Sequence, residues 1–309
     1  MQNNEVENEE ITFNKGCDEW LAFKQNTVKE SSFLNYKFKV NKHLRPDLGS
    51  LSLDELAKCD MNEYIIKKKK EKGITDNILN DCVILLKSIL RFLKRKYRID
   101  FNLDFNYRIN GNVNEIVVFN EKERQKLLKY LIESQNIKNL GVLISLYSGL
   151  RIGEVCGLKW KDIDFENKVL NVRRTIQRVY LGERESKIIS TTPKSKKSIR
   201  KIPLAKILIE KLKPLSTLYS KEDYIINGLS DKYTEPLVYR YTYQSVLKEC
   251  NVPYRKYHCL RHTFATRCIR VGMDIKSLSE VLGHSNIGIT LSTYVHSSYE
   301  VKKKYIDKL

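Results

Sequence analysis

The sequence predicts a mainly α-helical protein with a small antiparallel β-sheet, divided into an N-terminal helical domain and a mixed α+β C-terminal domain. Three observations support this fold class. Apolar residues recur with helical spacing over residues 11–98. Asn, Asp and Gly are dense over residues 99–117, which is typical of a linker. Apolar runs of strand length occupy residues 162–204, before helical spacing returns.

The N-terminal domain, residues 11–98, is expected to contain four helices. Apolar stripes indicate one helix near residues 13–23 and a second near residues 33–44. A third helical segment runs over residues 53–73. The fourth follows Thr75, a suitable N-cap. Its apolar face is wide and consists of Ile78, Leu79, Cys82, Val83, Leu86, Ile89, Leu90 and Leu93.

The C-terminal domain, residues 118–309, alternates between helices and strands. A helical segment begins at Phe119, and residues 137–160 are helical with a break at residues 148–149. Helices return from Leu204 to the end of the chain. Between them we expect strands at residues 163–165, 169–179 and 199–202, the first two joined by a turn at residues 166–167.

Charge indicates a polyanionic partner, most commonly DNA or RNA. The formal net charge is +19, and residues 1–110 hold 20 basic against 17 acidic side chains. The remaining +16 therefore falls on residues 111–309. Two basic runs in the N-terminal domain are either solvated helix faces or phosphate contacts, and charge alone does not choose between them. The candidate DNA contacts in these runs are Lys67, Lys68, Arg91, Lys94 and Arg95.

Composition argues against several other classes of protein. No run of about 18 apolar residues occurs, so we expect no membrane span. Residues 1–10 are polar and acidic, which predicts a flexible N-terminus without a secretory signal and a cytoplasmic location. The seven cysteines include no CxxC pair, which favours reduced, buried side chains over disulfides or zinc.

A first candidate site is the segment SGLRIGE, residues 148–154. Gly149 allows a sharp turn, and Arg151 follows where a new helix starts. Backbone N–H groups there favour an anion, and a guanidinium binds two phosphate oxygens at once. Glu154 lies one turn further on the same face and can orient Arg151 or another basic group. Alone, this pattern also fits a surface arginine between two helices.

A second candidate site is HCLRH, residues 258–262. On a helix, His258 and Arg261 share one face. A neutral imidazole relays a proton, and an arginine stabilises phosphate charge. His258 and His262 also have the spacing of metal ligands, but no acidic residue of the HExxH type lies between them, so we expect no metal.

A third candidate site joins LGHSN, residues 282–286, to Tyr294. Gly283 ends one helix and Ser285 is a suitable cap for the next. His284 then lies at the turn, and Tyr294 about two and a half turns into the following helix. Most tyrosines serve packing, so composition alone gives no reason to choose Tyr294.

A fourth candidate is a lysine in TPKSKKSIRKIPL, which starts at Thr192. A lysine on a hairpin loop can enter a DNA groove and give a proton to a leaving oxygen. Lys194 is our candidate, although Lys196 and Lys197 are neighbours and the choice among them stays open.

The order Arg, Lys, His-x-x-Arg, Gly-His and Tyr resembles the catalytic signature of the tyrosine recombinases, the phage-integrase family. The match covers roughly residues 118–300, and residues 11–98 resemble the family's core-type DNA-binding domain. The resemblance implies a site-specific recombinase that cleaves and rejoins DNA in integration, excision or resolution. It also implies double-stranded DNA as partner, a homotetramer on paired sites, and a C-terminal tail helix that packs on a neighbouring subunit.

By this resemblance, Tyr294 is the nucleophile that forms a 3′-phosphotyrosyl link. Arg151 and Arg261 clamp the non-bridging oxygens, and His284 adds a hydrogen bond to the phosphate. His258 assists as acid–base or hydrogen-bonding group, and Lys194 is the general acid, with Glu154 in support. This chemistry needs no metal or other cofactor, and no GxxxxGK[ST] run suggests a nucleotide.

Two other functions remain open. A type IB topoisomerase-like enzyme uses the same chemistry but relaxes DNA without exchanging partners. A non-catalytic DNA-binding protein would use residues 283–285 only as the turn of a helix–turn–helix. About ten residues precede the first helix, too few for an additional folded domain, so we expect a two-domain form. The target sequence, and the choice among integrase, resolvase and transposon-type roles, cannot be read from the sequence.

Overall fold

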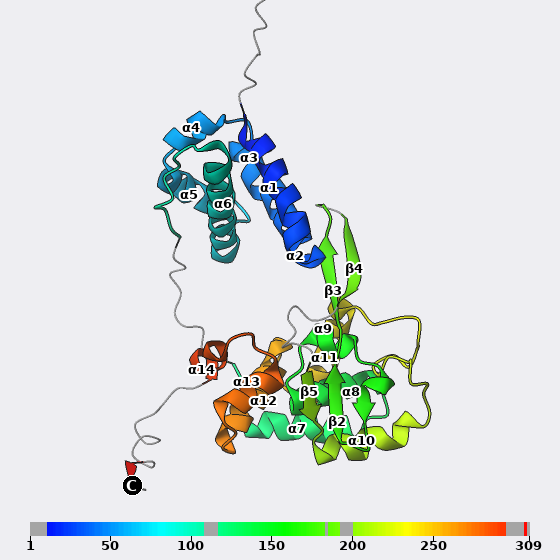
Figure 1. Cartoon of the computed structure of the whole chain (residues 1–309). Coiled ribbons are helices and arrows are strands. Elements are labelled where there is room, and N and C mark those ends of the chain that lie inside the picture. Colours follow the sequence, from blue (N-terminus) through cyan, green and yellow to red (C-terminus); the bar gives the residue numbers. More distant parts are fainter. Residues whose placement is uncertain (1–10, 108–116, 183–184, 192–199, 295–305, 308–309) are drawn as a thin grey trace, which may run out of the picture. The chain divides into compact units, whose positions relative to one another are not determined.

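The computed structural model describes residues 11–107, 117–182, 185–191, 200–294 and 306–307 (Figure 1). The chain divides into two compact units. The first comprises Met1–Asn114 together with Val179–Lys187, and the second comprises Glu115–Arg178 and Ile188–Leu309. Predictions that concern residues 1–10, Lys194 and the tail at residues 297–305 lie outside the described residues.

The first unit is helical and is built around one apolar core. Trp20, Leu44 and Ile89 are among the side chains that bury almost completely there. Its helices are α1 (Phe13–Thr27), α2 (Glu30–Lys39), the π-helical turn η1 (Val40–Leu44), α3 (Arg45–Leu48), α4 (Leu53–Lys58), α5 (Met61–Lys69) and α6 (Asp76–Tyr97).

Helix α6 forms as predicted, whereas the expected third helix is two helices. Thr75 caps α6 by accepting a hydrogen bond from the backbone N–H of Ile78, and its wide apolar face is buried. The segment over residues 53–73 breaks at Cys59, whose backbone is extended. Asp60 then caps α5 through the backbone N–H groups of Asn62 and Glu63. Asp60 therefore begins a new helix, α5, where apolar spacing predicted one continuous helix.

The segment expected to be a linker contributes to the first core. Its described parts, residues 99–107 and residue 117, contain no helix or strand. Phe101 and Phe105 are nevertheless only 3% and 2% exposed and pack into the apolar core of the first unit. Because Asn and Asp are dense in this segment, its composition did not indicate that these two rings are buried.

The second unit surrounds helix α8 (Leu140–Ser148), which is buried on nearly every side. A helix that is apolar all round belongs in a protein interior. The other helices are α7 (Glu121–Glu133), α9 (Ile152–Cys156), α10 (Lys206–Ser216), α11 (Pro236–Glu249), α12 (His258–Arg270), α13 (Ile275–Leu282) and α14 (Ile287–Tyr294), with 3₁₀ turns at Ile137–Asn139 and Trp160–Asp162. Helix α12 packs against α8, and this contact fixes the position of the HCLRH segment.

The strands in the described part of the chain form two sheets. A three-stranded antiparallel sheet has the order β1-β2-β5, with Ile163 opposite Leu170 and Leu170 opposite Ile202. Strands β3 and β4 form a separate two-stranded sheet. The strands are β1 (Ile163–Asp164), β2 (Val169–Val172), β3 (Thr175–Tyr180), β4 (Ser186–Thr191) and β5 (Arg200–Pro203).

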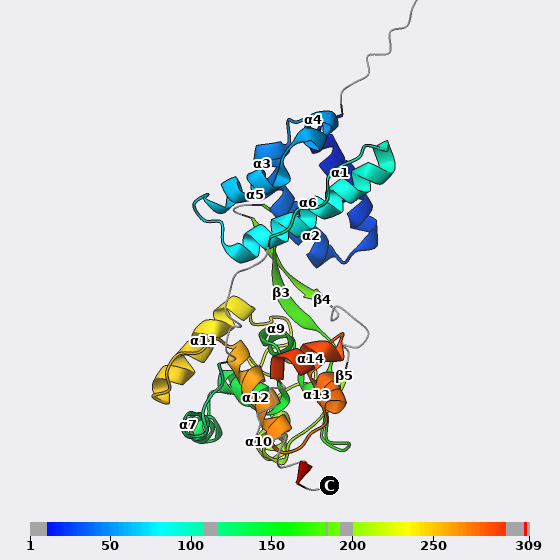
Figure 2. The ribbon, with the colours of Figure 1, turned by 90° about the vertical axis from the view of Figure 1, so that its left-hand side faces the viewer.

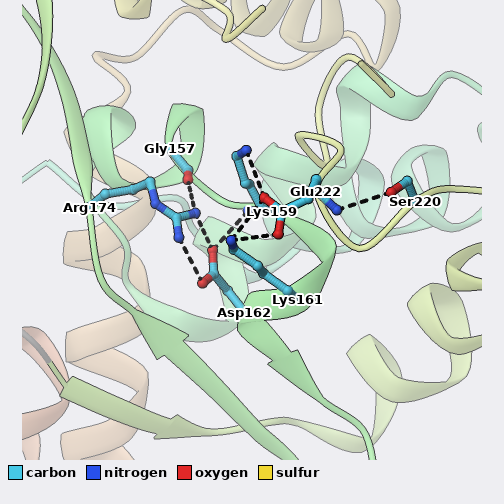
Figure 3. A network of polar contacts seen from close by, with 7 residues as sticks. All are labelled: Gly157, Lys159, Lys161, Asp162, Arg174, Ser220 and Glu222. Atoms are coloured by element: carbon cyan, nitrogen blue, oxygen red, sulfur yellow. Dashed lines mark hydrogen bonds and ion pairs between the residues drawn. The ribbon is translucent and has the colours of Figure 1, made fainter. Parts of the chain in front are cut away.

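The prediction of one strand over residues 169–179 was wrong, and strand β4 was missed. The apolar run breaks at Arg173 and Arg174, and a network of polar contacts holds this break (Figure 3). Arg174 donates to both carboxylate oxygens of Asp162, at 2.6 and 3.2 Å, and to the carbonyl of Gly157 at 3.0 Å. Asp162 is 1% exposed, so this buried ion pair ties the chain between β2 and β3 to the 3₁₀ turn at Trp160–Asp162, and the hydrogen bond to Gly157 ties it to the end of α9.

None of the helices in the described part of the chain has the length and hydrophobicity that crossing a bilayer requires.

Candidate active site

The C-terminal end of helix α13 forms the centre of the site. Helices α12, α13 and α14 contact one another, as both views of the ribbon show (Figures 1 and 2). Gly283 ends α13 with a left-handed backbone, φ 67°, which glycine adopts without strain. The last carbonyls of α13 accept hydrogen bonds from three arginines: Arg200 Nε to Val281 O at 2.6 Å, Arg261 Nη2 to Leu282 O at 2.8 Å and Arg151 Nη1 to Leu282 O at 3.5 Å.

Arg261 is the most deeply buried of these cations. It is 1% exposed, and its Nη1 also donates to the carbonyl of Gly149 at 2.9 Å. Burial, together with the positive charge of Arg151, lowers the pKa of Arg261 to about 9, which still leaves it protonated at neutral pH. The side chain is therefore a fixed positive charge held by carbonyl dipoles.

Glu154 joins two of the arginines. Its carboxylate accepts hydrogen bonds from Arg200 Nη1 and Nη2, both at 3.0 Å, and from Arg151 Nη1 at 3.1 Å. It also accepts from the backbone N–H of Arg151 at 2.9 Å. Burial opposes its ionisation, but the hydrogen bonds and charge of Arg200, with Arg151, outweigh burial and lower the pKa of Glu154 below its usual range. Glu154 thus holds both guanidiniums in place.

The Arg151 side chain is 39% exposed, whereas those of Glu154 and Arg200 are 4% and 5% exposed. Arg151 therefore extends to the surface, whereas the Glu154–Arg200 ion pair that anchors it is buried. A guanidinium in this position can bind an incoming phosphate without first being ordered.

His284 lies directly after Gly283, at the turn between α13 and α14. Its Nδ1 is 2.7 Å from Thr290 Oγ1, which fixes the ring. Burial, followed by the charges of Arg261 and Arg151, lowers the pKa of His284 to about 4. The ring is therefore neutral at pH 7 and retains one N–H donor.

The cap of α14 differs from the prediction. The side chain of Asn286, not Ser285, accepts a hydrogen bond from the N–H of Gly288, at 2.8 Å. Asn286 directly precedes the helix, which is the position at which a side-chain oxygen satisfies the N–H groups of the first turn. The helix therefore begins one residue later than a Ser285 cap would place it.

Tyr294 is the last residue of α14 and faces α12. Its hydroxyl is 2.8 Å from Nδ1 of His262. Burial raises the pKa of Tyr294, while the nearby charges of Arg261 and Arg151 act in the opposite direction. The hydroxyl therefore lies within the field of the arginine cluster.

His258 begins α12 and lies beside His262, with ring centroids 4.6 Å apart and the planes nearly perpendicular. Burial, then the charges of His262 and Arg261, lowers the pKa of His258 to about 4. Both rings of the HCLRH segment are thus part of the same cluster as the arginines.

The structure brings most of the predicted site together. Lys194 lies outside the described residues. Two contributors were not assigned a role from the sequence: Arg200 and His262. Arg200 lay in the quoted TPKSKKSIRKIPL segment but gave no signal of its own. His262 was visible through its spacing of four residues from His258. The predicted residues that meet here are Arg151, Glu154, His258, Arg261, His284 and Tyr294.

The candidate DNA contacts of the first unit differ in environment. Lys67, Arg91 and Arg95 are exposed. Lys94 is exposed and pairs with Asp100. Lys68 instead has a side chain that is only 4% exposed, and its ammonium pairs with Asp47 at 2.5 Å and Glu71 at 3.1 Å. Lys68 is therefore a buried structural ion pair and does not present its charge to a ligand.

Comparison with known proteins identifies the family. The model of the phage integrase family matches residues 117–301, and that of the phage integrase N-terminal SAM-like domain matches residues 12–69. The XerC-like tyrosine recombinase of Caldanaerobacter subterraneus is 37% identical over 213 residues, covering 63% of this chain and 54% of that relative. The transposase of transposon Tn916 from Enterococcus faecalis is 28% identical over 307 residues, covering 91% and 74%.

Solved structures show the same fold. The Tn1549 transposon integrase, determined in complex with a circular intermediate DNA, superposes with a TM-score of 0.77 at 23% identity and covers 96% of this chain and 99% of that one. The match of the family model to residues 117–301 spans more than half of the sequence. The chain therefore belongs to the phage integrase family.

Proposed function

We propose that this protein is a site-specific tyrosine recombinase, which breaks and rejoins DNA through a 3′-phosphotyrosyl intermediate on Tyr294. Family membership supports breakage and rejoining of DNA, and the Tn916 transposase and XerC-like recombinase support recombination at specific sites. The observation that carries the assignment is the position of the Tyr294 hydroxyl, which is hydrogen-bonded to His262 beside Arg151 and Arg261.

The site provides what phosphoryl transfer needs. A phosphodiester is anionic and repels a nucleophile, so fixed cations must stabilise the charge that grows on its non-bridging oxygens. Arg151, whose side chain is 39% exposed, is already oriented by Glu154, and Arg261 supplies a buried, fixed positive charge held by carbonyl oxygens. His284, fixed by Thr290, donates a further hydrogen bond to the phosphate.

The covalent intermediate explains why no nucleotide is needed. Attack of Tyr294 Oη forms a bond to phosphorus and breaks the bond to the 5′-oxygen. Lys194 gives its proton to that leaving oxygen. His258 packs against His262, whose ring contacts the tyrosine. The link to Tyr294 keeps the energy of the phosphodiester, so a 5′-hydroxyl of the partner strand can reverse the step.

The wider assembly follows from the same assignment. Double-stranded DNA is the substrate. Residues 11–98 belong to the core-type DNA-binding domain, whose apolar core also includes Phe101 and Phe105, and residues 118–309 contain the catalytic domain with its tail helix. Four copies acting on paired sites are supported by a relative of the same fold, the lambda integrase, which was solved as a tetramer bound to a Holliday junction. The proposed location of the protein is the cytoplasm, where it has access to its DNA substrate.

A covalent-trapping assay tests the function. Nicked fragments of the DNA that flanks the gene are incubated with the protein in EDTA without ATP, and the products are separated on a denaturing gel. We expect a slow-migrating, protease-sensitive DNA band, and mass spectrometry of the linked peptide should place the nucleotide on Tyr294. Specific binding without any covalent band would support the non-catalytic alternative, and attachment at another residue would contradict the choice of nucleophile.

The same material separates recombination from topoisomerase activity. A recombinase should join two site-bearing fragments to each other and leave supercoiled plasmids without the site unchanged. A type IB topoisomerase-like enzyme would instead relax such plasmids. Relaxation without the site, and without exchange of strands, would therefore replace the proposed function by this second one.

Arg91 and Arg95 are proposed to contact DNA phosphates, together with Lys67 and Lys94. We expect the Arg91→Ala/Arg95→Ala double variant to bind DNA more weakly and to lower the slope of log K against log salt by about 0.9 for each phosphate that the variant no longer neutralises. Fluorescence anisotropy between about 50 and 200 mM salt measures this slope. Lys58→Ala, an exposed lysine of α4 outside both basic runs, is the control. An unchanged slope in the double variant would show that Arg91 and Arg95 of α6 do not contact DNA phosphates.

A further inference from the structure

A histidine without an assigned role contacts the nucleophile directly. Nδ1 of His262 lies 2.8 Å from the Tyr294 hydroxyl, and the two ring centroids are 5.5 Å apart. A general base must lie within hydrogen-bonding distance of the proton that it removes. His262 meets this condition. His258, which was expected to assist as an acid–base or hydrogen-bonding group, makes an edge-to-face contact with His262.

We propose that His262 is a catalytic residue, the general base that removes the Tyr294 proton during cleavage. The inference rests on the proposed function. As Tyr294 Oη bonds to phosphorus, its proton moves to Nδ1 of His262, and the leaving 5′-oxygen takes a proton from Lys194. In the rejoining step the flow reverses, because His262 returns the proton to Tyr294 as the 5′-hydroxyl attacks.

The environment of His262 suits a base. Burial and the positive charge of Arg261 lower its pKa, so the ring is neutral at pH 7. When Nδ1 accepts the hydrogen bond from the tyrosine, the proton of the neutral ring is on Nε2. A charged imidazolium would have no free electron pair, so the lowered pKa keeps the accepting nitrogen available.

The environment of Tyr294 requires such a base. Burial raises the pKa of its hydroxyl, so the phenol is protonated before the reaction. The charges of Arg261 and Arg151 favour the ionised oxygen once it forms. Proton transfer to His262 therefore accompanies the attack, at the moment when the arginines and the phosphate share the developing charge.

His258 is less suited to this role. Its pKa is lowered to about 4, first by burial and then by the charges of His262 and Arg261, so it is a weak base. Its edge contact with His262 instead keeps that ring in position. The charged and titratable groups around His262 are His258 and Arg261 of α12 and Tyr294 of α14.

Two substitutions distinguish a base from a hydrogen-bonding group. His262→Asn keeps an acceptor oxygen near the position of Nδ1 but cannot take a proton at neutral pH, whereas His262→Ala removes both functions. The rate of covalent-complex formation is measured in a single turnover on a nicked duplex that carries the site found by trapping. We expect both variants to be slower than wild type by roughly 100-fold, in line with general-base catalysis.

Added imidazole provides a second readout. It should accelerate His262→Ala in proportion to its concentration and leave Tyr294→Phe inactive. A substrate with sulfur in place of the leaving 5′-oxygen needs no acid, so it should restore Lys194→Ala but not His262→Ala. DNA binding and thermal unfolding of each variant confirm that the fold is intact, and His262→Asn alone decides the question if His262→Ala does not fold.

The outcomes separate this inference from the proposed function. If His262→Asn cleaves at the wild-type rate, the residue only positions the tyrosine, and the proposal is overturned. Restoration of His262→Ala by the sulfur-containing substrate would make His262 the acid instead. If wild-type protein forms no covalent complex at all, the proposed function itself fails.

Discussion

Tyr294→Phe should bind DNA like wild type and form no covalent complex. The substitution removes one oxygen from a ring at the end of α14, where the partner of that oxygen is His262. Loss of a nucleophile that acts with its neighbours as a unit lowers the rate by roughly 10⁵-fold or more. Quantitative trapping on the nicked site, with binding measured by gel shift on the same DNA, provides both values.

Tyr219→Phe is the matched control. It also removes a single hydroxyl, from a ring stacked on Trp160 with centroids 5.5 Å apart, and it should cleave normally. A covalent complex of wild-type intensity from Tyr294→Phe would mean that another residue attacks the phosphate. Loss of DNA binding by Tyr294→Phe would instead show that the hydroxyl serves the structure of α14.

Glu154→Gln should destabilise the second unit and inactivate the enzyme. The amide keeps the size of the side chain but leaves Arg200, 5% exposed, without its counter-charge. Breaking a buried ion pair by removing one partner costs about 3–5 kcal/mol of unfolding free energy. Arg151 loses the same anchor, so its orientation toward a phosphate should fail even in molecules that remain folded.

Tryptophan fluorescence during urea unfolding measures this effect. Trp20 belongs to the core of the first unit and Trp160 to that of the second, so a Trp20→Phe background reports the second unit alone. Glu222→Gln is the control, because this exposed carboxylate pairs with Lys159 and Lys161 at the surface, and its removal should leave stability nearly unchanged (Figure 3). Equal stability of Glu154→Gln and wild type would show that water reaches the arginines.

Local signals in the sequence were sufficient for much of the fold. The apolar face of α6, its Thr75 cap and the glycine end of α13 all depend on neighbours a few residues away. The misplaced features depend on side chains that compete with apolar spacing. Asp60 started a new helix within an apolar pattern, and Arg174 interrupted a strand because Asp162 binds it.

The order of the sequence motifs predicted those residues of the candidate site that form the family's catalytic signature. Arg200 and His262 were missed because their partners, Glu154 and Tyr294, are distant in sequence and meet them only in the folded chain. Lys68 shows the converse, since a lysine within a basic run forms a buried ion pair with Asp47. Charge counted along a sequence does not distinguish a cation that faces solvent from one that supports the interior.

The end of α13 connects the carbonyls that hold the arginines to the helix that carries the nucleophile. The carbonyls of Val281 and Leu282 hold three guanidiniums, and the chain that leaves them continues through Gly283 into the helix that carries Tyr294. Any side chain added at Gly283 would crowd Arg200, whose Cδ lies 3.1 Å from the position of a Cβ. A shift of this one segment would therefore displace together the carbonyls that hold the guanidiniums and the helix that carries Tyr294.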